Sequence, residues 1–299
     1  MTGPFPVTDS AELTVDGVPL RVRISGPADG VPVLLIHGIA RSLEDWTETQ
    51  DLLARTHRVI STDLPGFGFS RKGRSRPGLP GFGRAMASLL DAAAVTAPVH
   101  VMGNSLGGGV AMTLAADHPD RVASVTLVNS VGFGSEANIS ALPMTYGILA
   151  QLPGLSTRFG PKAREAGANT IRDLFFDRSL ATTDQLRHAG RLAKQRDFRA
   201  TFLGTAATLG APVVGVKAGW RRDLLRRFGA TGIPVLVVWG DDDRILPPKH
   251  LDAAKLVFPH ARTHLFADTG HMPQVERAAD FVDVAAAFVA EVEAERAAS

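Results

Sequence analysis

The sequence predicts an α/β protein in which a mostly parallel sheet carries helices on both faces and is interrupted by a helical insertion. Short apolar runs that suit buried strands alternate with segments whose apolar residues recur at helical spacing. Around Ser105 a strand, a one-residue turn and a helix follow one another, and the helix ends at His118, before Pro119. From about 132 to 232 the strands disappear. Helical connections of this length imply right-handed crossovers, and therefore parallel strands.

The expected strands of the first part begin with a hairpin. Ala11–Val15 and Leu20–Ser25 alternate apolar and polar residues around Asp16-Gly17, which predicts an antiparallel edge to the sheet. Val33–Ile36 is a continuous apolar run, and Arg58–Thr62 is the next strand. Between these two, the buried face of a helix is marked by Leu43, Trp46, Leu52 and Leu53.

The segment before the central strand has a different composition. Arg71–Gly83 is polar, basic and rich in Gly and Pro, so we expect an exposed connection there and a helix near Arg84–Ala94. The central strand, Val99–Asn104, and the strand Ala123–Val128 follow.

The chain is thus expected to divide into three ranges. Residues 1–131 form the first part of the core, 132–232 form a helical cap, and 233–299 form the second part of the core. The second part is expected to contain the strand Val235–Trp239, the helix Lys249–Phe258, the strand Thr263–Phe266 and a final amphipathic helix.

Composition narrows the class of protein. Hydrophobic residues make up 45% of the chain and charged residues 21%, which is ordinary for a globular protein. No stretch approaches the length of a membrane span, and Met1–Ser10 has no basic segment followed by an apolar run, so we expect a cytoplasmic protein. The absence of Cys excludes disulfides and thiolate catalysis and removes the usual soft ligands of zinc.

Motifs of nucleotide binding are missing. No Gly-x-x-x-x-Gly-Lys-Ser/Thr segment occurs, and the pairs Gly66-Gly68 and Gly132-Gly134 lack the third Gly of a dinucleotide fingerprint. We therefore expect a small-molecule substrate, no cofactor, no metal ion, and neither nucleic acid nor a membrane as partner.

Positive charge is concentrated in one range. Residues 156–230 contain 15 Lys and Arg against 6 Asp and Glu, although the whole chain has a formal charge of only +2. Solvated helix faces explain this surplus, and we favour that interpretation. The alternative is attraction of anionic substrates or of an acidic surface.

The chemistry is predicted to centre on Ser105. The pattern Gly103-Asn104-Ser105-Leu106-Gly107 fits a sharp turn that exposes a serine hydroxyl above a sheet, although a Gly-rich turn with a capping Ser has the same pattern. A serine of ordinary pKa is a poor nucleophile, so it needs a base, and the base needs an orienting partner.

Two later residues suit these roles. Asp243 follows one predicted strand and His271 follows the next, and the carboxyl ends of parallel strands meet at one rim of a sheet. The neighbours Asp241 and Asp242 are weaker candidates for the acid, and no His spacing accompanies them that would suit a metal. Structural roles are expected for the other histidines, including a loop position for His37 and a satisfied core imidazole for His100.

Five segments together resemble the α/β-hydrolase fold superfamily. They cover nearly all of the chain outside the cap: His37-Gly38, Asp63-Leu64-Pro65-Gly66-Phe67-Gly68, Gly103-Asn104-Ser105-Leu106-Gly107-Gly108, Gly240-Asp241-Asp242-Asp243 and Gly270-His271. The resemblance implies an eight-stranded, mostly parallel sheet with an inserted cap. It also implies that Ser105 is the nucleophile, His271 the general base and acid, and Asp243 the orienting carboxylate.

The same resemblance implies an oxyanion hole and a reaction. The backbone N–H groups of Ile39 and Leu106 match the positions that stabilise the tetrahedral intermediates of acyl transfer. Gly38, Asn104 and Met272 are the candidate substrate contacts. Epoxide hydrolases and dehalogenases of this fold carry Asp at the nucleophile position, so Ser105 argues against both.

Three functions stay open. The leading hypothesis is a carboxylic ester hydrolase for a small or medium apolar substrate, because the cap supplies many apolar residues. The second is a carbon–carbon bond hydrolase, because the elbow and Leu174–Leu180 are similar to meta-cleavage-product hydrolases. That family follows its histidine with Trp where this chain has Met272, and its cap arginine has only shifted candidates, Arg187 and Arg191. The third is a non-catalytic receptor of the same fold.

Overall fold

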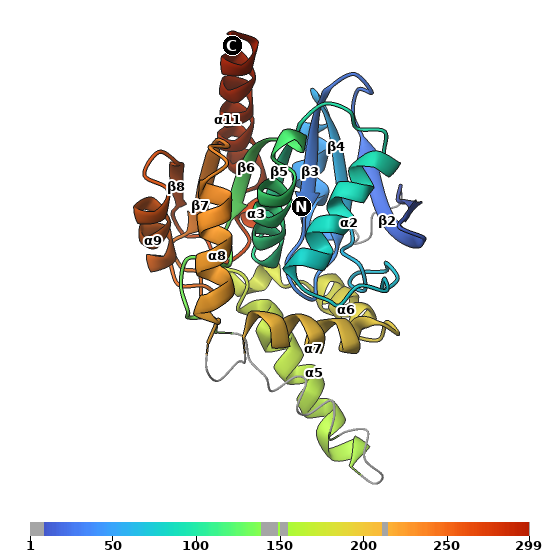
Figure 1. Ribbon diagram of the computed structural model, residues 1–299. Helices are drawn as coiled ribbons and strands as arrows, with labels where there is room; N and C mark the ends of the chain where they lie inside the picture. The colour runs from blue at the N-terminus through green and yellow to red at the C-terminus, as the bar shows by residue number, and fades with distance from the viewer. Residues whose placement is uncertain (1–8, 139–148, 150–154, 211–214, 299) are drawn as a thin grey trace.

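The computed structural model describes residues 9–138, 149, 155–210 and 215–298. Its centre is an eight-stranded sheet of order β1-β2-β4-β3-β5-β6-β7-β8 (Figure 1). β2 runs antiparallel to β1 and β4, and every other neighbouring pair is parallel, which confirms the predicted fold class. The strands are β1 Ala11–Val15, β2 Val18–Ser25, β3 Val31–Ile36, β4 His57–Thr62, β5 Val99–Asn104, β6 Val122–Val128, β7 Val235–Gly240 and β8 Arg262–Phe266.

The hairpin between β1 and β2 forms at the predicted turn. Asp16 has a φ of 50° and Gly17 a φ of 75°. A two-residue hairpin turn favours positive φ at both positions, because that backbone twist matches the twist of the flanking strands, and Asp-Gly tolerates it best.

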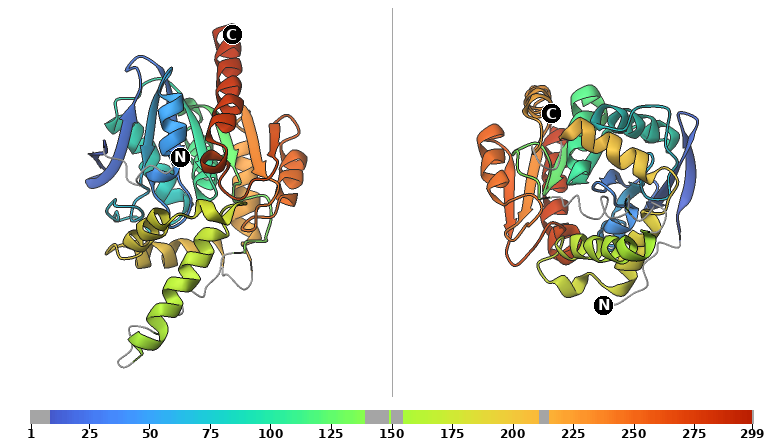
Figure 2. Two further views of the ribbon diagram at one scale, coloured as in Figure 1. Left: turned by 180° about the vertical axis from the view of Figure 1, so that it is seen from behind. Right: turned by 90° about the horizontal axis from the view of Figure 1, so that it is seen from below.

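Helices cover both faces of the sheet. One face carries α2 (Leu79–Ala92), α3 (Leu106–Asp117), α8 (Ala218–Gly229) and α9 (Lys249–Val257). The other face carries α1 (Thr47–Leu53), which follows a 3₁₀ turn at Leu43–Trp46, and α11 (Ala278–Ala298); both are seen from behind in Figure 2. Each layer buries its own apolar cluster against the sheet, so the strands are buried on both faces, as in parallel sheets generally.

The start of α2 differs from the prediction. The sequence predicted an exposed connection as far as Gly83, but α2 begins at Leu79, and Leu79 and Phe82 are buried. Pro80 is tolerated in the first turn because the N–H that proline lacks has no acceptor within the helix there. The Gly and Pro residues therefore led to the prediction of a loop. The burial of Leu79 and Phe82 instead favours a helix in this segment.

Three helices from the predicted cap range lie together beyond one end of the sheet. These are α5 (Ser156–Arg172), α6 (Thr183–Leu192) and α7 (Phe198–Leu209), and α5 projects from the body of the molecule (Figures 1 and 2). Another helix in the described part of this range, α8, packs against α3 on a face of the sheet. Residues 139–148, 150–154 and 211–214 of the predicted cap lie outside the described residues.

Within the described part of the chain, no helix combines the length and the apolar character needed to cross a bilayer.

Candidate active site

Ser105 lies at the turn between β5 and α3. Its φ of 56° and ψ of −116° fall in a region that residues other than glycine rarely adopt, and its N–H donates to Val128 O at 2.9 Å. A Cβ on Gly103 would lie 2.3 Å from Gly107 C, so strand and helix approach at a distance that only glycine allows. The turn therefore holds the Ser105 side chain at the carboxyl end of the central strand.

Asp243 follows β7, and its carboxylate is fully engaged. Oδ1 accepts the N–H groups of Ile245 at 2.8 Å and Leu246 at 2.9 Å. Oδ2 accepts from Asn129 Nδ2 at 2.6 Å, and the side chain is almost fully buried. Three donors thus fix the position of the carboxylate.

His271 follows β8 and is in direct contact with Asp243. Its Nδ1 lies 2.8 Å from Asp243 Oδ2. A carboxylate acceptor selects the tautomer with the proton on Nδ1, which leaves Nε2 as an acceptor. The main chain of His271 is held on both sides, because its N–H donates to Leu174 O at 2.8 Å and its carbonyl accepts from Asn104 Nδ2 at 3.0 Å.

The two N–H groups predicted for an oxyanion hole come from loops that adjoin Ser105. Leu106 is the first residue of α3, where backbone N–H groups have no acceptor within the helix. Ile39 follows β3, and a Cβ on the preceding Gly38 would lie 3.3 Å from Ser105 Cβ. The loop after β3 therefore passes directly beside Ser105.

The predicted substrate contacts have different surroundings. Gly38 adjoins Ser105, whereas Asn104 uses its amide nitrogen on His271 O and, at 3.3 Å, on Val128 O. Met272 is buried, and Gln274 Nε2 lies 4.0 Å from its sulfur. Asn104 is thus engaged with the main chain of the His271 loop.

The two candidates for a cap arginine lie on α6. Helix α6 buries Gln185, His188 and Leu192, which lie three and seven positions apart on one face. Arg187 and Arg191 lie on the exposed face, and Arg187 pairs with Asp184. Both side chains are therefore in contact with solvent, and their candidacy as the cap arginine stays a prediction.

Sequence reasoning missed three side chains that support the site. Asn129 has a φ of 42° and binds Asp243, and Glu276 binds Gly270 N at 2.8 Å. Asn129 could have been found, because it directly follows β6 at the same rim of the sheet as Ser105 and Asp243. His188 carried no signal, because its partners lie on another element of the fold.

His188 joins the cap to a buried polar cluster beside the loop after β3. Its Nε2 lies 2.8 Å from Ser42 Oγ and 3.5 Å from Glu44 Oε2. Burial would raise the pKa of Glu44, but hydrogen bonds from His188 and Arg21 outweigh burial and hold that pKa well below its usual range. Asp63 Oδ1 accepts Leu43 N at 2.8 Å, so the cluster also fixes the backbone beyond Ile39.

His37 and His100 have the structural roles that the sequence predicted. His37 is buried, its Nδ1 lies 2.7 Å from Gly38 O, and its Nε2 accepts Leu64 N at 2.9 Å. Burial lowers its pKa, and the same cause lowers the pKa of His100 to about 4. Both imidazoles are thus neutral near pH 7.

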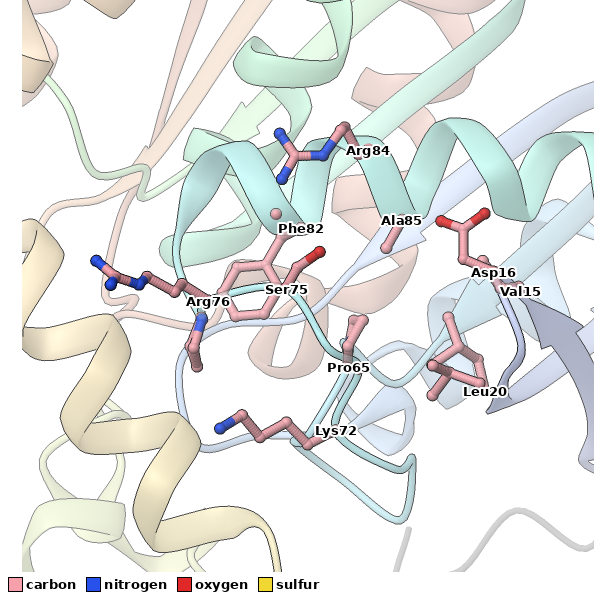
Figure 3. Close-up of a pocket in the computed structure, with 14 residues that line it drawn as sticks. Val15, Asp16, Leu20, Pro65, Lys72, Ser75, Arg76, Phe82, Arg84 and Ala85 are labelled. Atoms are coloured by element: carbon pink, nitrogen blue, oxygen red, sulfur yellow. The ribbon is translucent and has the colours of Figure 1, made fainter.

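A separate small pocket of about 60 Å³ lies between the β1–β2 hairpin and α2 (Figure 3). Leu20, Pro65 and Phe82 contribute its apolar wall. The charged ends of Lys72 and Arg76 lie apart in Figure 3 and do not converge on one point. No candidate catalytic residue lines this pocket.

The chain was compared with known proteins. A profile of the α/β hydrolase fold family matches residues 31–278. The chain is 36% identical over 270 residues to the dihydrolipoyllysine-residue acetyltransferase component of the acetoin cleaving system of Cupriavidus necator, and the match covers 89% of this chain but 65% of that relative. It is 28% identical over 287 residues to 2-hydroxymuconate semialdehyde hydrolase of Pseudomonas sp. strain CF600, with 92% of each chain covered.

Among solved structures, an esterase from Thermogutta terrifontis superposes with a TM-score of 0.71 at 22% identity, covering 95% of this chain and 99% of that one. At this identity the similarity shows the fold alone. Because the family profile spans most of the chain, the protein belongs to the α/β-hydrolase fold family.

Proposed function

We propose that the protein is a serine hydrolase that cleaves carboxylic esters of small or medium, largely apolar molecules through an acyl-enzyme. The observation that carries the proposal is the 2.8 Å hydrogen bond between His271 Nδ1 and Asp243 Oδ2. This bond directs the lone pair of Nε2 away from the carboxylate, where it can accept the proton of the Ser105 hydroxyl.

The reaction then proceeds in two halves. His271 takes the proton of Ser105 as Oγ attacks the ester carbonyl, and gives it to the departing alcohol. Water, activated by the same imidazole, then attacks the acyl-enzyme and releases the acid. Asp243 stabilises the imidazolium that forms in each half, and the N–H groups of Leu106 and Ile39 stabilise the oxyanion.

Ester cleavage is favoured over carbon–carbon cleavage by the exposure of both candidate cap arginines. Arg187 and Arg191 are exposed on α6 and Arg187 is paired with Asp184, whereas an arginine that binds the carboxylate of a ring-fission product is expected to be held in a pocket. The second candidate, a carbon–carbon bond hydrolase, is favoured by the match to 2-hydroxymuconate semialdehyde hydrolase over 92% of both chains. The two differ in substrate and share Ser105, His271 and Asp243.

One parallel assay tests the proposal. Aryl esters of graded chain length are compared with a dienoate ring-fission product, for the wild type, Ser105→Ala and His271→Ala. We expect turnover of the short-chain esters, and a loss on the order of 10⁶-fold in both variants with nearly unchanged melting temperature. Faster turnover of the dienoate would favour the second candidate. Substantial ester turnover by His271→Ala would mean that the base lies elsewhere.

A serine-directed phosphonate separates an enzyme from a receptor. The wild type should be labelled and Ser105→Ala should not. Folded wild-type protein that resists labelling would contradict the proposal and favour the receptor.

The acyl-enzyme could also transfer its acyl group to a thiol in place of water. The relative from Cupriavidus necator is named an acetyltransferase component, and this chain spans 65% of its length. Adding dihydrolipoamide to the ester assay tests this transfer. With water as the acceptor, no thioester should accumulate, whereas thioester formation that requires Ser105 would redefine the reaction as acyl transfer.

A further inference from the structure

A short segment of the predicted cap range, Leu174–Phe176, lies directly against the loop that carries His271. His271 N donates to Leu174 O at 2.8 Å. A Cβ on Gly270 would come within 2.7 Å of both Leu174 O and Phe176 N. The two backbones are therefore in contact. The side chain of Phe175, between Leu174 and Phe176 in the sequence, is fully buried.

Glu276 joins these two segments with one carboxylate. Its Oε1 accepts Gly270 N at 2.8 Å and its Oε2 accepts Phe176 N at 2.8 Å. Glu276 ends α10 (Pro273–Glu276), five residues after His271, whereas Phe176 lies a hundred residues earlier in the sequence. Burial raises the pKa of Glu276, although the N–H donors and the nearby imidazole of His271 act in the opposite direction.

A second contact ties the same segment to the loop of the acid. Arg244 Nη1 donates to Phe175 O at 3.2 Å, and Arg244 Nη2 lies 2.5 Å from Asp242 Oδ2. Arg244 directly follows Asp243. The segment Leu174–Phe176 thus contacts both loops that bring Asp243 and His271 together.

We propose that Glu276 is a positioning residue that holds Leu174–Phe176 against the His271 loop, so that the reactivity of Ser105 depends on how this segment is seated. The inference rests on the proposed function, in which His271 is the base. Without the carboxylate, Phe176 N and Gly270 N both lose their acceptor. The hydrogen bond from His271 N to Leu174 O is then the main contact that holds the two backbones together. The imidazole is therefore less well fixed in its orientation towards Ser105.

The charge of Glu276 also acts on the imidazole. The charged groups close to His271 are Asp243 on the loop after β7 and Glu276 on α10, while Arg244 is paired with Asp242 and Arg277 donates to Ala267 O. A carboxylate near an imidazolium stabilises it. Removing that charge should therefore move the acid limb of kcat/KM to lower pH.

Two substitutions separate position from charge. Glu276→Gln keeps the shape, but its NH₂ group faces one of the two N–H donors, so one hydrogen bond is lost together with the charge. Glu276→Asp keeps the charge but withdraws the carboxylate by one methylene. Glu291→Gln is the matched control, because Glu291 is a partly exposed carboxylate on α11, where it pairs with Arg262.

The variants are assayed on a short-chain aryl ester for kcat, KM and the pH profile, with phosphonate labelling and thermal unfolding in parallel. We expect kcat and the labelling rate to fall about 10- to 100-fold in Glu276→Gln and Glu276→Asp, with KM changed less than about threefold. The acid limb should move to lower pH in Glu276→Gln only. Glu291→Gln should match the wild type. If Glu276→Gln does not fold, Glu276→Asp alone tests the proposal, and we expect it to show a lower kcat with an unchanged pH profile.

If Glu276 only stabilised the fold, the variants would behave differently. If folded Glu276→Gln and Glu276→Asp melt at lower temperature but keep the kcat and pH profile of Glu291→Gln, the inference is overturned and the proposed function stands. If the wild type shows no turnover or labelling that depends on Ser105, the proposed function fails, and the inference fails with it.

Discussion

Three groups of the candidate site are each held by a side-chain hydrogen bond. Asn129 holds Asp243, Asn104 holds the carbonyl of His271, and Glu276 holds Gly270. Hydrogen bonds to a charged group stabilise a fold more than those between neutral groups, and a buried donor without an acceptor is costly. The side chains at this site are therefore oriented before any substrate binds, which is what catalysis by positioning requires.

The tight turn at Ser105 makes a prediction about Gly107. A Cβ there would lie 2.2 Å from Ile36 O, which is backbone and cannot move aside. Gly107→Ala should destabilise the fold by about 3 kcal/mol or more, as expected for overpacking against a rigid neighbour. The control is Gly190→Ala in α6, where a Cβ would meet nothing within 4 Å. This substitution should stabilise the helix by roughly 0.5–1 kcal/mol. Chemical denaturation measures both, and a Gly107→Ala variant as stable as wild type would contradict the geometry.

At the scale of elements, β5, β6 and α11 meet at a buried histidine. His100 of β5 places Nδ1 2.7 Å from Ser124 Oγ of β6 and Nε2 3.2 Å from Glu293 Oε1 of α11. Burial lowers the pKa of His100 to about 4 despite the nearby carboxylate. The three elements are therefore packed around a neutral imidazole.

This packing predicts a dependence of stability on pH. The unfolded imidazole binds a proton near pH 6.5 and the folded one only near pH 4, so the free energy of unfolding should fall as the pH drops from about 6.5 to about 4. Since one pKa unit is worth about 1.4 kcal/mol, the expected loss is about 3 kcal/mol. Denaturant unfolding at several pH values measures it for the wild type and for His100→Asn. A slope that is unchanged in His100→Asn would assign the effect to other groups.

At the scale of the whole molecule, the site is assembled from loops that follow different strands. Gly38, Ser105, Asn129, Asp243 and His271 follow β3, β5, β6, β7 and β8, all at one rim of the sheet. The helices α5–α7 lie beyond the sheet (Figure 2), and Leu174–Phe176 joins this region to the rim. The geometry of the site is thus a property of the complete sheet.

The surplus of positive charge in 156–230 is distributed over exposed surface. Arg187 and Arg226 have more than half of their side chains exposed and pair with Asp184 and Asp223. We therefore expect kcat/KM for a carboxylated aryl ester to change no more than about twofold between low salt and physiological salt, like that for a neutral ester, because the basic side chains are spread over solvated helix faces and several are paired with carboxylates. A much steeper fall for the carboxylated ester alone would show that the basic range attracts anionic substrates.

The sequence predicted the strands and the candidate site residues better than it predicted where helix α2 begins. The succession of strands along the chain, the turn at Ser105 and the positions of Asp243 and His271 after consecutive strands follow from apolar spacing and turn residues, which are local properties. The start of α2 was predicted wrongly, because Gly and Pro near Leu79 suggested a loop and only the burial of Leu79 and Phe82 decides for a helix.

The sequence by itself therefore determined the fold class and the residues in which the chemistry is proposed to reside. The tertiary structure alone decided that Arg187 and Arg191 are exposed on α6, and that Glu276 meets Phe176 across a hundred residues of chain. The physical reason is the range of the forces involved. Backbone preferences and periodicity act over a few residues, whereas the rotation of a helix and the meeting of two loops depend on the packing of all the elements around them.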